Sequence, residues 1–191
     1  MTELILEKQR AERVANFNPR EFRNAMGEFA TGVVVISTDV DGEPHGMTAN
    51  AFMSGSLEPP LIIVSVACTA RMHDRIQRAG YFGVSVLSEH QEWCSNHFAG
   101  KPIEGKCPQF ERIGNVPVLS GANVQIATDL EHVYPCGDHT LFVGRVHTME
   151  RPKHPDRGLL FYAGRYGKII SKGTPLTFSL DENVYDATSC W

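Results

Sequence analysis

The stretch "GMTANAFMSGSLEPPLIIVSV", residues 46–66, contains the clearest fold signal in the chain. Its second half, Leu61–Val66, is a short apolar run rich in β-branched residues, which predicts a buried strand. Its first half is small and polar instead, with Thr48 and Asn50 placed shortly before that strand. Such a stretch is either an ordinary loop or a surface of backbone and small side chains against which a flat ligand can lie.

Composition and charge favour a soluble, globular protein with one domain. The chain has 191 residues, of which 42% are hydrophobic and 21% are charged, and its formal net charge is −4. Lys and Arg form no block, so nucleic acid is not expected as a partner. No apolar stretch approaches the roughly 18 residues that span a membrane, and the first residues lack the features of a signal peptide. We therefore expect no membrane partner and a cytoplasmic location.

Cysteine and histidine usage argues against a structural metal or a disulfide framework. The chain has five cysteines, an odd number, without a C-x-x-C pair. His132, Cys136 and His139 lie close in sequence, but the intervening Pro135 and Gly137 place them on a turn. We interpret these three side chains as ordinary polar turn residues and expect no metal site.

The helix and strand patterns predict a mainly β protein. Helices are expected over the charged residues 3–15 and after an Asn18 cap, where Pro19 and Glu21 begin a helix that Gly32 ends. A third helix is expected over 70–80, capped by Thr69 and ended by Gly80. A fourth is expected over 88–100, with Ser88 and Gln91 as a capping box. Residues 101–115 look irregular. Strands are expected at 33–38, 47–54, 61–67, 81–88, 122–135, 139–150 and 159–169. Strands and helices do not alternate regularly, so an antiparallel β-barrel with peripheral helices is the expected fold.

Two segments at strand or helix edges could bind a ligand. Arg71 stands at the start of a helix that follows directly on a core strand, which makes a phosphate site or, equally, a capped helix with a solvated arginine. Thr48 and Asn50 fall on one side of an extended segment and could hydrogen-bond a heteroaromatic ring. Taken alone, that segment is better read as a polar loop.

A third segment places His139 at the mouth of a strand, after Gly137-Asp138, although an isolated turn of this kind is usually structural. The sequence contains no G-x-S-x-G, P-loop, H-E-x-x-H or G-x-G-x-x-G motif. Nucleophile, P-loop and Rossmann chemistry are therefore not indicated.

Taken together, five ordered segments closely resemble the short-chain flavin reductases, the NAD(P)H:flavin oxidoreductases of two-component aromatic monooxygenases. The segments are "FATGVVVIST", "GMTANAFMSGSLEPPLIIVSV", "YFGVSVLSEHQ…FAG", "GDHTLFVGRV" and "LLFYAGRYGKI". The resemblance implies an FMN-binding, flavin reductase-like split β-barrel that forms a homodimer. It covers residues 17–170, which leaves 1–16 as an N-terminal helical extension and 171–191 as a C-terminal tail. Many relatives have Val at the position of Met47 and Thr or Ser at that of Met53.

The resemblance also implies which residues bind the cofactors. The flavin would lie along the 46–51 segment, face the end of the following strand, and be held on its phosphate side at the next helix. The nicotinamide would be bound by His139 and the 164–166 turn. The implied cofactor-binding residues are Gly46, Met47, Thr48, Asn50, Ala51, Ser65, Val66, Ala67, Arg71, Met72, His97, Phe98, His139, Gly164, Arg165 and Tyr166.

The implied activity is hydride transfer from NADH to FMN or FAD, with no acid–base dyad and with His139 as the catalytic residue in a positioning and electrostatic role. No arginine cluster for a 2′-phosphate is evident in the sequence, which favours NADH over NADPH; the choice between FMN and FAD stays open. The 191 residues are used up by one barrel, so reduced flavin would pass to a separate flavin-dependent oxygenase that acts on an aromatic compound such as a phenol. The alternatives are a flavin-binding electron carrier, a haem-binding or pyridoxamine-phosphate-oxidase-like barrel, and a non-enzymatic binding module.

Overall fold

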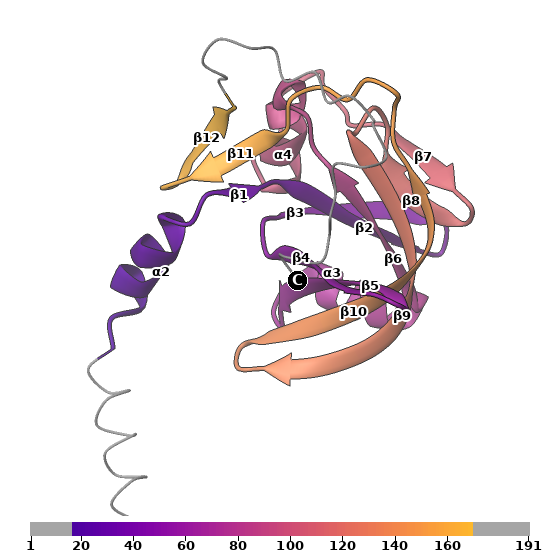
Figure 1. The fold of residues 1–191 in the computed structure, drawn as a ribbon, viewed down its shortest axis with the longest axis horizontal. Helices are drawn as coiled ribbons and strands as arrows, with labels where there is room; N and C mark the ends of the chain where they lie inside the picture. The colour runs from indigo at the N-terminus through magenta and orange to yellow at the C-terminus, as the bar shows by residue number, and fades with distance from the viewer. Residues whose placement is uncertain (1–16, 170–191) are drawn as a thin grey trace, which may run out of the picture.

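The computed structural model describes residues 17–169. The helix predicted at residues 3–15, the N-terminal extension 1–16 and the C-terminal tail 171–191 lie outside the described residues. Within 17–169 strands predominate and helices are few and short, as Figure 1 shows. The prediction of a mainly β protein with peripheral helices is confirmed.

The main sheet has seven antiparallel strands in the order β3-β2-β6-β9-β10-β5-β4. Their bounds are β2 Val34–Val40, β3 Glu43–Ala49, β4 Phe52–Leu57, β5 Pro60–Ala67, β6 Tyr81–Val86, β9 Val124–Cys136 and β10 His139–Glu150.

The two edges of this sheet are β3 and β4, yet these strands are consecutive in the chain. Ala49 ends β3 and Phe52 begins β4, so three peptide units keep their Cα atoms within about 11 Å. The sheet must therefore curl round until its edges approach each other. No strand pairing joins β3 to β4 in the described part of the chain, and the sheet is an open barrel rather than a closed one.

Two small sheets complete the β structure. β1 (Thr31–Gly32), β11 (Leu159–Tyr162) and β12 (Arg165–Lys168) form one of them. The other pairs β7 (Phe110–Ile113) with β8 (Val116–Leu119) in a hairpin.

The structure corrects two of the predicted strands and one segment that was predicted to be irregular. The 47–54 segment is interrupted at Asn50, where the chain leaves one edge strand for the other. The 159–169 segment is a hairpin, because Ala163 and Gly164 both adopt positive φ, of 47° and 78°, and turn the chain back. The end of the supposedly irregular 101–115 segment is strand β7, which is paired only with the short β8 that the pattern missed.

The first two helices differ in how well their ends were predicted. α2 (Pro19–Gly27) is capped by the Asn18 side chain, as predicted, but it ends before Gly32, which belongs to strand β1. α3 (Arg71–Ala79) ends at Gly80 in the left-handed conformation, as predicted. Its N-cap is Ala70, without a side-chain hydrogen bond, so the cap expected from Thr69 is wrong.

The third predicted helix consists of a 3-10 turn, η1 (Glu89–Gln91), followed by α4 (Glu92–Phe98). Its capping box is present, because the Gln91 side chain accepts a hydrogen bond from the Ser88 backbone N–H while the Ser88 side chain accepts from the Gln91 backbone. Within residues 17–169, no helix combines the length and the apolar character that crossing a membrane requires.

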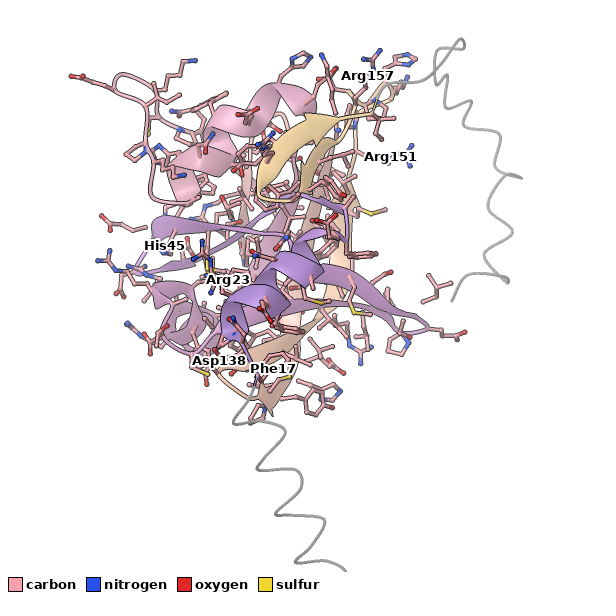
Figure 2. The ribbon with its side chains drawn as sticks, turned by 90° about the vertical axis from the view of Figure 1, so that its left-hand side faces the viewer. Phe17, Arg23, His45, Asp138, Arg151 and Arg157 are labelled. Carbon is pink, nitrogen blue, oxygen red and sulfur yellow. The ribbon has the colours of Figure 1, made fainter. Side chains whose placement is uncertain are left out.

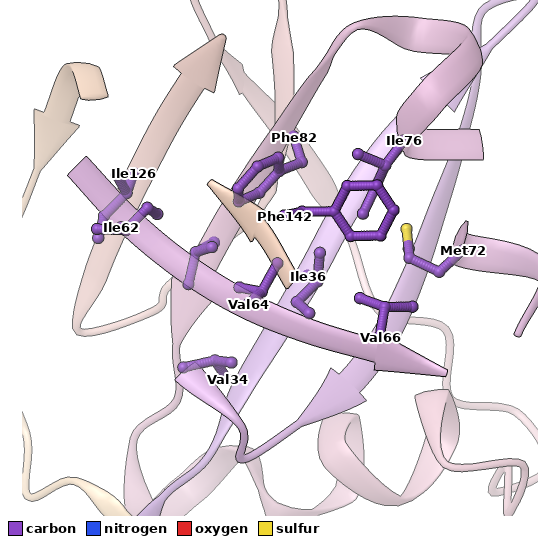
Figure 3. Close-up of a cluster of buried hydrophobic side chains, with 11 residues drawn as sticks. Val34, Ile36, Ile62, Val64, Val66, Met72, Ile76, Phe82, Ile126 and Phe142 are labelled. Atoms are coloured by element: carbon purple, nitrogen blue, oxygen red, sulfur yellow. The ribbon is translucent and has the colours of Figure 1, made fainter. Parts of the chain in front are cut away.

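A cluster of buried apolar side chains fixes α3 against the sheet (Figure 3). Met72 and Ile76 of α3 are fully buried and pack among side chains of β2, β5, β6 and β10. Burying an aliphatic side chain of this size contributes about 1.5–3 kcal/mol. This packing sets the position of the first turn of α3, and therefore of Arg71, next to β3.

Candidate functional site

An open groove of about 690 Å³ lies where β3, α3, α4 and the segment before β7 meet. A volume of this size lies within the range of ligand pockets. The structure brings six of the predicted site residues to this groove: Gly46, Met47, Arg71, Met72, His97 and Phe98. These residues come from three parts of the sequence, so their convergence supports a common ligand.

The aromatic wall of the groove requires a glycine at position 46. A β-carbon on Gly46 would lie 2.5 Å from Cε1 of Phe98, a contact that real side chains do not make. The Phe98 ring is also packed against Phe110, with 5.6 Å between ring centroids, and against His97 at 5.0 Å. Gly46 therefore lets the aromatic ring lie directly on the strand.

His97 carries a polar atom without a partner at this wall. Its Nδ1 is buried and makes no hydrogen bond, one of only two such side-chain atoms in residues 17–169. A buried nitrogen without a partner costs free energy unless a ligand or a water molecule satisfies it. Because this nitrogen has almost no accessible surface, a ligand in the groove reaches it only after the His97 ring turns.

The other end of the groove is electropositive. His45, which also lines the groove, has a pKa lowered by burial first and then by the positive charges of Arg75 and Arg71. Figure 2 shows His45 at the side of the molecule. Arg71 at the start of α3 supplies a guanidinium to this end, as a phosphate site requires.

A smaller cavity of about 210 Å³ contains Thr48, Asn50 and Tyr166, three more of the predicted residues. The Thr48 hydroxyl donates to the backbone oxygen of Ser95 over 2.6 Å, and the Ser95 and Tyr166 hydroxyls lie 2.8 Å apart. Gly164 and Asn50 line a neighbouring cavity beside α2. Ser95 therefore connects Thr48, predicted to bind the flavin, with Tyr166, predicted to bind the nicotinamide. Sequence reasoning missed Ser95 because a single serine inside a helix gives no signal.

The end of β5 has a backbone edge without a paired strand. Pairing with β4 stops at Val64, after which the Ser65 N–H donates to the Ala51 oxygen over 3.0 Å. Within 17–169 no strand continues beside Val66 and Ala67 on that edge. Val66 is buried as a whole residue, so it offers almost no surface to a ligand.

His139 and Arg165 are not among the residues lining the groove. His139 lies opposite Ala67 in the β10–β5 ladder, is 43% exposed, and has its Nδ1 2.8 Å from the carboxylate of Asp138. Arg165 is exposed in the β11–β12 hairpin. A single chain therefore does not bring these two residues to the groove.

The described residues contain no group of three or more His, Cys, Asp or Glu side chains placed to hold a metal ion. Cys136 lies at the end of β9, directly opposite His139 in the hairpin, and His132 is four residues earlier on the same strand.

A comparison with known protein families shows the class to which the chain belongs. A family model described as "Flavin reductase like domain" matches residues 26–169. The chain therefore belongs to the flavin reductase-like family.

Individual relatives agree with that assignment. The chain is 42% identical over 155 residues to an NADH-dependent flavin reductase of a Rhodococcus species, covering 79% of this chain and 86% of the relative. It is also 42% identical over 129 residues to the reductase component of 4-hydroxyphenylacetate 3-monooxygenase of Thermus thermophilus, covering 68% and 83%. Among solved structures, the flavin reductase PheA2 in its native state superposes with a TM-score of 0.77 at 42% identity, covering 81% of this chain and all of the other.

Proposed function

We propose that this protein oxidises NADH, passes the hydride to FMN or FAD, and supplies the reduced flavin to a separate flavin-dependent aromatic monooxygenase. The observation that carries the proposal is the groove in which Gly46, Phe98 and Arg71 converge, in a chain of the flavin reductase-like family. Residues 17–170 would form the reductase domain.

The groove residues fit a flavin. Met47 and the Phe98 ring, which packs on Gly46, offer an apolar surface for the isoalloxazine ring. The imidazole of His97, which lines the groove, would turn its unpartnered Nδ1 toward the polar edge of that ring. Arg71 would bind the flavin phosphate with charge-assisted hydrogen bonds.

The redox chemistry is supplied by the flavin and the nicotinamide, which exchange a hydride when their rings are stacked. The chain has to hold the two rings at about 3–3.5 Å between the reacting atoms and to keep water out. Ser95 would hold the side chains of Thr48 and Tyr166 in fixed positions, since it hydrogen-bonds both of them and is fully buried. No side chain is required to move a proton.

We infer that the nicotinamide is bound by His139, Gly164, Arg165 and Tyr166, with the protein acting as a homodimer. His139 and Arg165 are exposed away from the groove of their own chain, so a two-fold partner is the simplest way to complete the site.

Exposed apolar side chains on two elements support the dimer. α2 contains no buried residue, Phe29 directly after it is 75% exposed, and Tyr134 on the β9–β10 hairpin is 52% exposed. Exposed apolar side chains on α2 and next to it, Phe17, Phe22, Met26 and Phe29, are typical of a protein–protein interface.

The separate oxygenase is supported by the Thermus relative, whose name describes it as the reductase component of a monooxygenase. Its substrate in the present system would be an aromatic compound such as a phenol. The free thiols of the described cysteines, Cys68, Cys94, Cys107 and Cys136, fit the reducing cytoplasm.

A steady-state assay that combines each of two flavins with each of two nicotinamides tests the function. We expect NADH oxidation that depends on added FMN or FAD, slower oxidation of NADPH, and hydrogen peroxide as the product in air, with catalase returning part of the oxygen. The proposal fails if neither flavin accelerates NADH oxidation, or if the isolated protein hydroxylates a phenol unaided.

A further inference from the structure

Three residues from different parts of the sequence meet at the small cavity of about 210 Å³. The Thr48 hydroxyl of β3 donates a hydrogen bond to the backbone oxygen of Ser95 in α4 over 2.6 Å. The Ser95 hydroxyl is hydrogen-bonded in turn to the hydroxyl of Tyr166 in β12, with 2.8 Å between the oxygens. In the described part of the chain, Ser95 is the one residue that forms hydrogen bonds with both of these side chains.

Ser95 itself has a fixed position. It is fully buried, and its backbone oxygen also accepts a hydrogen bond from the Ala99 N–H over 3.0 Å at the C-terminal end of α4. The same helix carries His97 and Phe98, which line the flavin groove. Both β3 and β12 are therefore attached to the helix that forms the groove wall.

The position of Tyr166 in β12 depends on this contact. β12 is the outer strand of the small sheet β1-β11-β12 and pairs only with β11. Over residues 17–169, the contact with Ser95 is the only side-chain hydrogen bond formed by a residue of β12. The other contacts of the Tyr166 ring are apolar, among them the Phe161 ring, and apolar contacts have no preferred direction. The hydroxyl contact therefore fixes the Tyr166 side chain in one place.

The cavity lies where the two cofactor sites meet. Thr48 and Asn50 are assigned to the flavin and Tyr166 to the nicotinamide, and all three line the same space as Ser95. The separation of the two rings therefore depends on how β12 is held relative to β3. Hydride transfer is sensitive to this separation, because a misplacement of about 1 Å can lower the rate about a hundredfold.

We propose that Ser95 is a positioning residue for hydride transfer, which acts by holding Tyr166 at a fixed distance from Thr48. The inference rests on the proposed function, because it takes Thr48 to bind the flavin and Tyr166 the nicotinamide. In the step concerned, the bond between C4 of the nicotinamide and its hydrogen breaks, and a bond from that hydrogen to N5 of the flavin forms. The electron pair moves with the hydrogen, so NADH is oxidised to NAD⁺ and the flavin is reduced by two electrons. Ser95 supplies neither a proton nor a charge to this step.

The substitution Ser95→Ala tests the role selectively. It removes the hydroxyl and keeps the backbone oxygen, so it breaks the contact with Tyr166 and retains the one with Thr48. The rate constant of flavin reduction, measured anaerobically by stopped-flow absorbance at saturating NADH, should fall by about tenfold or more. The flavin dissociation constant should stay within about twofold of the native value. With NADH deuterated at C4, the isotope effect on steady-state turnover should increase, because hydride transfer then limits the rate to a greater extent.

A double-mutant cycle with Tyr166→Phe shows whether Ser95 acts through Tyr166. Each single variant should slow flavin reduction, and Ser95→Ala should have no further effect when Tyr166 is already replaced. The same cycle is followed by urea unfolding of the protein without cofactors. There the shift of the unfolding midpoint in the double variant should be smaller than the sum of the two single shifts. This second readout does not depend on activity.

Ser85→Ala is the matched control. Ser85 on β6 is also fully buried, and its hydroxyl accepts a hydrogen bond from the Leu119 N–H over 2.8 Å, outside the cavity. This variant should lower the unfolding midpoint and leave the rate constant of flavin reduction within about twofold of the native value. A loss of stability alone is thereby separated from a loss of positioning.

Flavin reduction by Ser95→Ala at the native rate would overturn the inference, as would additive effects in either cycle or a loss of flavin affinity as large as the loss of rate. These results differ from failure of the proposed function. Rapid flavin reduction by the native protein that Ser95→Ala leaves unchanged rejects only the positioning role. If NADH does not reduce the flavin on the native protein, the proposed function is rejected, and the positioning role with it.

Discussion

The ring of Phe98 lies on the backbone of Gly46, so close that a β-carbon at Gly46 would be 2.5 Å from the ring. One residue is in the middle of an edge strand and the other ends helix α4. Their contact builds the aromatic wall of the groove, and it explains the glycine that opens the stretch with which the sequence analysis began.

Replacing Gly46 with Ala should displace the Phe98 ring. Overpacking of this kind costs about 1–3 kcal/mol, and we expect a comparable loss of flavin affinity, roughly ten- to a hundredfold. Urea unfolding and flavin fluorescence measure the two effects. Gly32→Ala is the control, since a β-carbon there meets no atom within 4 Å. If Gly46→Ala binds flavin as tightly as the native protein, the groove is not the flavin site.

Replacing Arg71 with Ala should raise the dissociation constants of both FMN and FAD. The loss of a charge-assisted hydrogen bond to phosphate costs roughly 1.5–3 kcal/mol, which is about ten- to a hundredfold in affinity. Riboflavin lacks the phosphate, so its affinity should be the same in the native protein and the variant. A loss of riboflavin binding of equal size would show that Arg71 does not act on the phosphate.

Replacing His139 with Ala should raise the KM for NADH and leave the flavin dissociation constant nearly unchanged. The reason is its position at the start of β10, outside the groove that we assign to the flavin. Steady-state kinetics at saturating flavin measure the first quantity and fluorescence titration the second. Collapse of flavin affinity with normal NADH kinetics would contradict the assignment.

Asp39 makes the stability of the fold depend on pH. It is buried on β2 and accepts hydrogen bonds from Tyr81 and Arg112, and no other ion pair in residues 17–169 has so buried a carboxylate. Burial raises the pKa of Asp39, but the two hydrogen bonds and the charge of Arg112 outweigh it, and the pKa is lowered. A lowered folded-state pKa means that this stabilisation is present above the unfolded value of about 3.9 and is lost as the pH falls through the folded value.

The free energy of unfolding should therefore decline as the pH falls below about 4. In Asp39→Asn the stability at pH 7 should be lower and the decline on acidification smaller. Urea titrations from neutral to acidic pH measure both. An identical acid dependence in the native protein and the variant would show that Asp39 does not contribute.

The sequence predicted the mainly β fold because its strand segments are apolar and rich in β-branched residues, as in Leu61–Val66. It predicted the capping box of Ser88 and Gln91 because a local hydrogen-bond pattern has a local signature. It predicted the wrong N-cap for α3, Thr69 instead of Ala70, because a cap depends on backbone geometry. It also missed the β7–β8 hairpin, because short strands depend on tertiary pairing.

The site was predictable only in part, for the same reason. The resemblance to a family supplied Arg71 and His97, and the structure brings both to one groove. Ser95 and Arg75 carry no sequence signal of their own. Ser95 matters because it contacts Tyr166, which is distant in the sequence. Arg75 matters because its helix face lies beside the edge strand β3, which carries His45, an arrangement that only the folded chain shows.

The most direct test of the central claim is an anaerobic titration of the protein and FAD with NADH, followed by the visible absorbance of the flavin. Our account predicts that one equivalent of NADH bleaches one equivalent of flavin, rapidly and only when the protein is present, and that admitting air restores the absorbance and produces hydrogen peroxide. A flavin that binds but keeps its absorbance in excess NADH would contradict the account, and would favour a flavin-binding electron carrier instead.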